Sequence, residues 1–73
     1  MKLLHAVSPE TKPFWPGIGG QEIPENTVGA VVSVYGTSPL NVVYEVEFVA
    51  DDGETLGIVT LSGSDIQPLR PSA

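Results

Sequence analysis

The sequence predicts an all-β fold in a single domain, residues 1–73, on two observations. Seven prolines and eight glycines interrupt the chain so often that no window longer than about ten residues keeps the apolar spacing of an amphipathic helix. Between these breaks lie short runs of β-branched and aromatic residues, which are typical of strands. A chain of 73 residues has a small core, and without cysteine it is stabilised by packing alone or by a partner.

The first central strand is expected at residues 28–35, VGAVVSVY, which are rich in β-branched side chains. Because successive side chains of a strand point to opposite faces, alternate residues from Val28 to Val34 are predicted to face the core. Ser33 lies between them and is expected to face solvent. The strand then ends in GTSPLN, residues 36–41, which contains glycine, proline and asparagine.

The clearest strand is VYEVEFVA, residues 43–50, in which apolar side chains alternate with two glutamates. One of its faces is expected to be buried and the other to meet water, as in an antiparallel sheet. The DDGE that follows at 51–54 is a strong hairpin signal, because glycine accepts a positive φ. It leads into TLGIVTL, residues 55–61, whose mixed pattern predicts burial on both faces or a bulge at Gly57.

Shorter strands are expected at the two ends of the chain. Residues 2–7, KLLHAV, predict a first strand. Residues 62–69, SGSDIQPL, resemble a 3₁₀ turn that a serine can cap, followed by a last strand that places Ile66 and Leu69 in the core; the tail at 70–73 is expected to fray. The predicted core consists of the inward-facing side chains of these strands: Val32, Val34, Tyr44, Val46, Phe48, Ile58 and Ile66.

This order of elements is the layout of a small SH3-like barrel of five strands. The long loop after the first strand, called RT in such barrels, spans residues 8–27 here. A loop of this length without regular structure is either functional or packed on itself. Its centre, PFWPGIGG at residues 13–20, places the chain's one tryptophan beside a phenylalanine, between two prolines and ahead of three glycines.

The charges of the chain are unevenly distributed. Nine acidic residues stand against three basic ones, and the basic residues, Lys2, Lys12 and Arg70, leave residues 13–69 without a positive side chain. An acidic domain suits a basic protein partner, but acidity is also an ordinary source of solubility. No apolar run approaches the ~18 residues of a membrane span, and anionic membranes are disfavoured by the charge. The lack of cysteine fits a cytoplasmic location.

We predict that the protein does not bind nucleic acid, because a nucleic-acid interface needs a basic surface to neutralise phosphates. Gel-shift titrations with single- and double-stranded DNA and RNA at low salt should show no complex at micromolar protein. A saturable shift that weakens as salt is added would contradict this electrostatic argument.

No motif in the sequence predicts catalysis, a cofactor or a metal ion. His5 is expected to be an edge side chain rather than a base or a metal ligand. A set of Ser8, His5 and Asp65 lacks the sharp turn that presents a nucleophile. The GIGG of the loop, residues 17–20, lacks the strand and helix that aim amides at a phosphate, so a tight turn is expected there.

The carboxylates likewise predict no catalytic or metal site. DDGE together with Glu47 lacks the calcium-binding loop, which leaves at most weak and nonspecific cation binding. Glu45 and Glu47 lie two residues apart on one strand face without a visible cleft. They are therefore expected to form a solvated face rather than the paired acids of a glycosidase.

Phe14 and Trp15 are the strongest candidates for a binding role. One interpretation is that a ring folds over an open side of the barrel and closes it. The other is that a ring projects as an aromatic anchor for a partner, since Trp is enriched among interface hot spots. Adjacent side chains of an extended loop point apart, so one ring is expected to pack inward while the other projects.

Two stretches, IPENTVGAVVSVYG and YEVEFVADDGETLGIVTLSGSDIQPL, resemble a family of small bacterial proteins catalogued as domain of unknown function 4926. The resemblance covers residues 1–7 and 23–69 and implies an SH3-like barrel in a bacterial, often cyanobacterial, cytoplasm. It also implies a role as partner of a neighbouring gene product, in the manner of antitoxins or immunity proteins, and no site residues. TKPFWPGIGGQ is longer and more aromatic than the family's loop, so no loop specificity is carried over.

The sequence therefore favours a non-enzymatic protein-interaction module, with an antitoxin or immunity-type role as its most specific form. Two other classes stay open: an accessory subunit of a larger assembly, such as a photosynthetic or respiratory complex, and a reader of proline-rich peptides, which uses clustered aromatic residues. The oligomeric state is open. The residues expected to bind a protein partner are Phe14, Trp15, Glu45, Glu47, Asp51 and Asp52.

Overall fold

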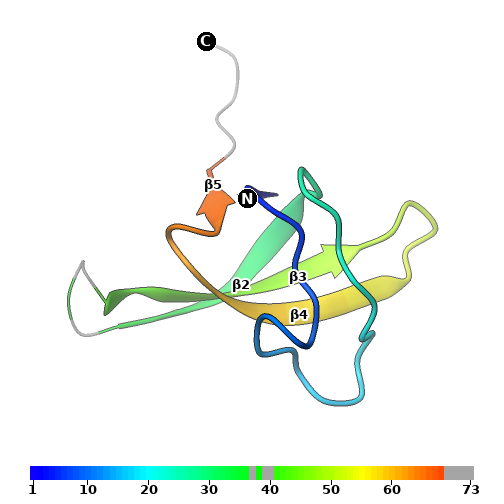
Figure 1. Cartoon of the computed structure of the whole chain (residues 1–73), viewed down its shortest axis with the longest axis horizontal. Coiled ribbons are helices and arrows are strands. Elements are labelled where there is room, and N and C mark those ends of the chain that lie inside the picture. Colours follow the sequence, from blue (N-terminus) through cyan, green and yellow to red (C-terminus); the bar gives the residue numbers. More distant parts are fainter. Residues whose placement is uncertain (37, 39–40, 69–73) are drawn as a thin grey trace, which may run out of the picture.

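The computed structural model describes residues 1–36, 38 and 41–68, so Leu69 and the tail at 70–73 lie outside the described residues. These residues form strands, turns and loops, without an α-helix (Figure 1). The five strands are β1 (Lys2–Leu3), β2 (Gly29–Tyr35), β3 (Val43–Val49), β4 (Thr55–Ser62) and β5 (Ile66–Gln67). Strands β2, β3 and β4 form one antiparallel sheet in that order, and β1 pairs with β5 in a second.

The hairpin between β3 and β4 confirms the DDGE prediction. The Ala50 amide donates to the Glu54 carbonyl (2.8 Å), and Gly53 takes a φ of 89°, which a side chain would disfavour. On β4, Phe48 pairs with Gly57 but Val49 pairs with Thr55, so the bulge falls one residue before Gly57. Consecutive residues of β4 are buried, which confirms the expected burial on both faces.

The predicted closed barrel is not formed by the described strands. Among the described residues, the two sheets are joined only at one corner, where Lys2 forms a bridge with Val28 and Met1 bonds to Gly29, and β1 and β5 are two residues long each. The expected strand at 2–7 is short because the chain bends at Leu4 and His5, although the Leu4 amide still donates to the Asp65 carbonyl (2.9 Å). At the other end, Pro68 has no amide to continue the β5 ladder.

The turn before the last strand is as short as predicted. Residues 63–65 form one hydrogen-bonded turn, in which the Asp65 amide donates to the Ser62 carbonyl (3.0 Å) with the i→i+3 spacing of a 3₁₀ turn, and β5 starts at once, so no 3₁₀ helix develops. No residue described by the structure belongs to a helix of membrane-spanning length and hydrophobicity.

The core lies between one face of the three-stranded sheet and the segments that cross in front of it in Figure 1. Val7 and Ile23 belong to these covering segments and are tied to each other by paired backbone hydrogen bonds of 2.9 and 2.7 Å. Val46, Phe48 and Ile66 are buried in the core as predicted, and Tyr44 is partly buried against it; Ile58 is buried too, but its pairing with Glu47 places it on the other face of the sheet. The central cluster consists of Leu3, Val7, Ile23, Val46, Phe48, Val59, Leu61 and Ile66.

The prediction for β2 is wrong, since Val32 is 48% exposed and Val34 is 59% exposed. Val31 pairs with Val46 but Ser33 pairs with the adjacent Glu45, which makes Val32 the extra residue of a bulge. The alternation counted from Val28 is out of phase already before the bulge, where Gly29 and Val31 share the core face with Phe48 and Val46, and the bulge then shifts it by one residue. After the bulge, Val34 pairs with Tyr44, which packs against the core, so Val34 returns to the core face. It lies near the end of the sheet and stays exposed.

Gly29 faces the core in place of the expected Val28 and Ala30, which are exposed. A Cβ at Gly29 would lie 2.7 Å from the Phe48 ring and from Val46, so only glycine fits against these two side chains. A small residue on β2 therefore admits the largest fully buried side chain of the core.

We predict that Phe48→Ala lowers the free energy of unfolding by about 3–5 kcal/mol, because it leaves a cavity in a small core. Thermal and urea unfolding followed by circular dichroism measure this loss. Val32→Ala is the matched control, and its side chain is half-exposed, so its effect should stay below about 1 kcal/mol. A Phe48→Ala protein that melts with the wild-type midpoint would contradict the assignment of this core.

Candidate functional site

Residues 13–15 run along the edge of β4 that faces away from β3, as a short extension of the sheet. The Thr60 amide donates to the Pro13 carbonyl (2.9 Å), and the Trp15 amide donates to the Ile58 carbonyl (2.9 Å). Phe14 forms an antiparallel bridge with Val59 between these two bonds. The aromatic pair therefore sits on extended backbone that the sheet holds in place.

The glycines after the aromatic pair turn the loop back against β4. Gly19 takes a φ of 66°, and a Cβ there would lie 1.8 Å from the Leu56 carbonyl oxygen. Contact this close between two backbones requires glycine. GIGG thus makes a tight turn that packs the loop on the sheet.

The two rings point apart, as expected for adjacent residues of an extended chain. Phe14 is partly buried, packs against the core and lies over Gly57, where a Cβ would meet the ring at 3.0 Å. Trp15 is 41% exposed on the opposite face of the sheet. Phe14 therefore belongs to the core, and Trp15 is the ring that projects.

We call the face that carries Trp15 the outer face of the sheet, since the core covers the other face. Residues directly opposite in an antiparallel pair share a face. Three strands contribute to the outer face: Ala30, Ser33 and Tyr35 from β2, Val43, Glu45 and Glu47 from β3, and Ile58, Thr60 and Ser62 from β4.

The indole of Trp15 reaches across β4 and is tied to β3 by a hydrogen bond. Trp15 Nε1–H donates to Glu45 Oε2 (2.6 Å), and the Thr60 hydroxyl donates to Glu45 Oε1 (2.7 Å). Glu45 is only 7% exposed, so its expected place on a solvated face is wrong. One carboxylate oxygen thus orients the tryptophan, and the other is held by Thr60.

Glu47 lies one pair further along the outer face, opposite Ala30 on β2 and Ile58 on β4. It is half-buried, and none of the side-chain hydrogen bonds and ion pairs among the described residues involves it. A second carboxylate thus lies near Glu45 without a cation from the described part of the chain.

Asp51 and Asp52 lie in the exposed turn between β3 and β4. Asp52 Oδ1 accepts the Glu54 amide (2.9 Å), which is a local turn bond. The structure therefore brings Trp15 and Glu45 together, with Glu47 on the same face. The two aspartates stay in the turn and Phe14 in the core.

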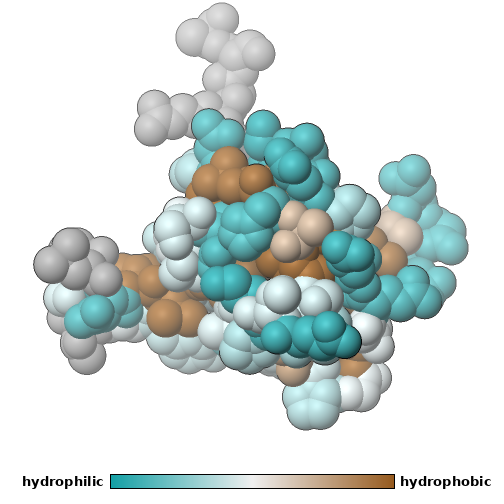
Figure 2. Space-filling model, viewed as in Figure 1, coloured by the Kyte–Doolittle hydropathy of each residue, from teal (hydrophilic) through white to brown (hydrophobic). Residues whose placement is uncertain are grey.

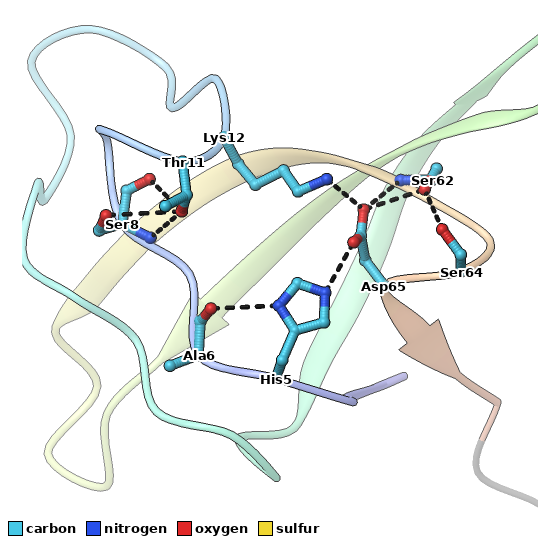
Figure 3. A network of polar contacts seen from close by, with 8 residues as sticks. All are labelled: His5, Ala6, Ser8, Thr11, Lys12, Ser62, Ser64 and Asp65. Carbon is cyan, nitrogen blue, oxygen red and sulfur yellow. Dashed lines mark hydrogen bonds and ion pairs between the residues drawn. The ribbon is translucent and has the colours of Figure 1, made fainter.

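A second polar cluster surrounds the buried carboxylate of Asp65 (Figure 3). His5 Nε2–H donates to Oδ1 (2.8 Å), and Lys12 Nζ lies 3.0 Å from Oδ2. The amide and the hydroxyl of Ser62 also donate to Oδ2, at 2.9 and 3.0 Å. This cluster, which the sequence did not predict, fastens the segment at 5–12 to the turn before β5.

Asp65 is held as the carboxylate despite its burial. Burial raises its pKa, but the Ser62 amide, Lys12, His5 and the Ser62 hydroxyl outweigh this and lower the pKa to about 2. The pKa of His5 is raised, first by its hydrogen bond with the Ala6 carbonyl and then by its bond with Asp65. The charged forms of both side chains are therefore favoured.

The Asp65 cluster is not a catalytic triad. The second ring nitrogen of His5, Nδ1, lies 3.2 Å from the Ala6 carbonyl oxygen, which is an acceptor. Ser8 pairs with Thr11 instead: the Ser8 amide donates to the Thr11 hydroxyl (2.9 Å), which donates to the Ser8 carbonyl (3.1 Å). Neither ring nitrogen of His5 faces a nucleophile.

Comparison with known protein families assigns the chain to one family. A family model described as Domain of unknown function (DUF4926) matches residues 18–68, which is more than half of the chain. The chain belongs to this family. No curated protein and no solved structure matches the chain. The match begins after Trp15, so the family assignment covers β2 to β5 but not the aromatic pair.

We predict that the protein loses stability in acid partly through Asp65. The folded state holds the pKa at about 2, below the ordinary 3.8, so the unfolded state takes up the proton first as the pH falls. This contribution, about 2 kcal/mol, is complete above about pH 4 and is lost as the pH falls toward about 2. Urea unfolding between about pH 6 and pH 2.5 measures it.

Asp65→Asn is the control, since it removes the titrating group and should flatten this part of the stability profile. His5 acts with the opposite sign: its raised pKa gives a contribution that is present below about pH 6.5 and lost at higher pH. A wild-type profile that parallels that of Asp65→Asn below about pH 4 would show that this carboxylate is not held as described.

Proposed function

We propose that the protein is a non-enzymatic binding module that holds a basic segment of a protein partner against the outer face. The observation that carries this proposal is the half-exposed indole of Trp15, fixed by the buried carboxylate of Glu45. A large apolar ring that is half-exposed and held in one orientation contributes little to the packing of the protein's own core. It is the kind of side chain that dominates protein interfaces.

The orientation of Trp15 lowers the entropy cost of binding. Its backbone is hydrogen-bonded to β4, its indole N–H is bonded to Glu45, and Pro13 and Pro16 stiffen the flanking chain. Side chains that are ordered before association lose less conformational freedom when a partner arrives. Trp15 therefore resembles a preorganised binding residue more than a closing lid.

The charges on and around the outer face favour a basic partner. Residues 13–69 contain no lysine or arginine, and eight of the nine acidic residues lie within that range. Glu47 is half-buried on the outer face, and Asp51 and Asp52 extend the negative charge to the hairpin turn. Such a distribution steers a positive partner and raises its association rate.

Within this proposal, the antitoxin or immunity-type role in a bacterial cytoplasm remains the most specific form. It draws on an acidic surface suited to binding one basic partner. An open relative of the SH3-like barrel fits the antiparallel order of β2, β3 and β4 with the short β1–β5 pair. A non-enzymatic role is supported by His5, since both of its ring nitrogens already face an acceptor oxygen.

We predict that Trp15→Ala weakens partner binding by about 2 kcal/mol or more, which is roughly thirtyfold in the dissociation constant. The partner is sought by co-expressing the tagged chain with the products of its neighbouring genes, and its affinity is then measured by calorimetry. Trp15→Phe keeps a ring but loses the bond to Glu45, so its affinity should fall between wild type and Trp15→Ala.

Leu4→Ala is the matched control, because Leu4 is exposed to a similar extent, 43%, but lies outside the outer face. All variants are first shown to be folded by circular dichroism, since the loss of the Trp15 bond to Glu45 also lowers stability. If folded Trp15→Ala and Leu4→Ala bind the partner as wild type does, Trp15 only covers the sheet and the proposal fails.

A further inference from the structure

Strand β2 lies at the edge of its sheet, and most of that edge has no partner among the described residues. At its start, the Gly29 amide donates to the Met1 carbonyl (2.8 Å), and the Met1 amino group donates to the Gly29 carbonyl (2.9 Å). This pairing stops at Gly29. Beyond it, β2 and β3 run together to the left-hand end of the molecule in Figure 1, away from the N-terminus.

The hydrogen-bonding groups on the open edge can be assigned from the register. Residues of an antiparallel pair alternate between those bonded to each other and those whose amide and carbonyl point away. Gly29, opposite Phe48, is of the second kind because both of its groups bond to Met1. Val31 and Val34, opposite the alternate β3 residues Val46 and Tyr44, must be so too.

Several side chains along this edge are apolar and exposed, and none is charged. Val32, Val34 and Tyr35 are all exposed, and residues 28–36 contain neither a charged residue nor a proline. Natural edge strands usually carry lysine or proline to prevent pairing, whereas here the bulge at Val32 is the one such feature. Figure 2 shows apolar surface on the projecting end of the molecule.

Charge determines which occupant suits this edge. A strand added beside β2 would lie about 10 Å from β3, two strand spacings away. On the outer face, only the small side chains of Ala30 and Ser33 stand between such a strand and Glu47 and Glu45. Lysine and arginine have long stems that cross apolar surface while the charged group reaches a carboxylate.

A second copy of the chain suits the edge less well. Each copy carries a net charge of −6 and would bring its own Glu45 and Glu47 beside the shared strands. Like charges brought together oppose association. A basic segment instead supplies the cation that Glu47 lacks among the described residues.

We propose that the edge of β2 from Val31 to Tyr35 accepts an extended segment that alternates basic and apolar side chains, as an added strand of the sheet. Its backbone bonds to the amides and carbonyls of Val31 and Val34. Its basic side chains cross the outer face to Glu47. Its apolar side chains lie on the opposite face and contact the exposed Val34 of β2. This proposal rests on the proposed function and names the partner segment's chemistry and its docking edge.

The test uses an octapeptide that alternates lysine and valine, titrated into the protein and followed by amide NMR. The expected result is saturable shifts along β2, with slower hydrogen exchange of the Val31 and Val34 amides. Val34→Pro removes one outward amide and should weaken binding at least tenfold, while Val34→Ala keeps the amide and should change it less than threefold. Glu47→Gln should weaken the binding of the lysine–valine octapeptide, and a glutamate–valine octapeptide should not bind.

Exchange protection in the wild-type protein decides the matter even if Val34→Pro fails to fold. Peptide binding that leaves the Val31 and Val34 amides unprotected would overturn the proposal. So would a wild-type dimer, seen by sedimentation, that Val34→Pro converts to a monomer, because the edge would then belong to a second copy. If Trp15→Ala weakens binding of the natural partner but Val34→Pro does not, the assignment of the β2 edge fails and the proposed function stands.

Discussion

Strand β4 is hydrogen-bonded along both of its edges, and the positions of the candidate binding groups depend on this. β3 occupies one edge and Pro13–Trp15 the other, so three neighbouring segments are fixed relative to one another. Because the extended backbone at 13–15 alternates its side chains, Phe14 enters the core and Trp15 crosses the outer face. The bond from Trp15 to Glu45 then joins the loop to the strand beyond β4.

The Asp65 cluster provides the second tie between the loop and the rest of the fold. Its partners come from the start of the chain, from Lys12 just before the aromatic pair, and from the end of β4. A buried carboxylate is costly unless it is paired and hydrogen-bonded, and here four donors satisfy it. The segment that leads into Pro13 is therefore held on both sides, which keeps Trp15 in place.

The two faces of the sheet have different roles in this arrangement. The inner face is filled by Phe48 and its neighbours, and Gly29 provides the space that the ring requires. The outer face keeps acidic and aromatic groups at the surface, and the open edge of β2 adjoins it. A partner that binds both the edge and the outer face would thus meet backbone bonding groups, an oriented indole and a carboxylate within one surface.

The sequence by itself determined the elements whose signals are local. The hairpin around Gly53, the β3 pattern around Phe48 and the absence of an α-helix from the described residues all follow from residues a few positions apart. The bulge at Val32 has no local signal, because it depends on how β2 matches β3. The phase of β2 depends on the same register, which places Gly29 rather than Val28 and Ala30 on the core face ahead of the bulge.

Only the tertiary structure decided the contacts between distant residues. Trp15 and Glu45 are 30 residues apart, and His5 and Asp65 are 60 apart. The sequence identified Trp15 and Glu45 as separate candidates, but the pairing of residues 13–15 with β4 brings them together. A hydrogen bond between side chains depends on strand register and loop closure, which composition and periodicity do not specify.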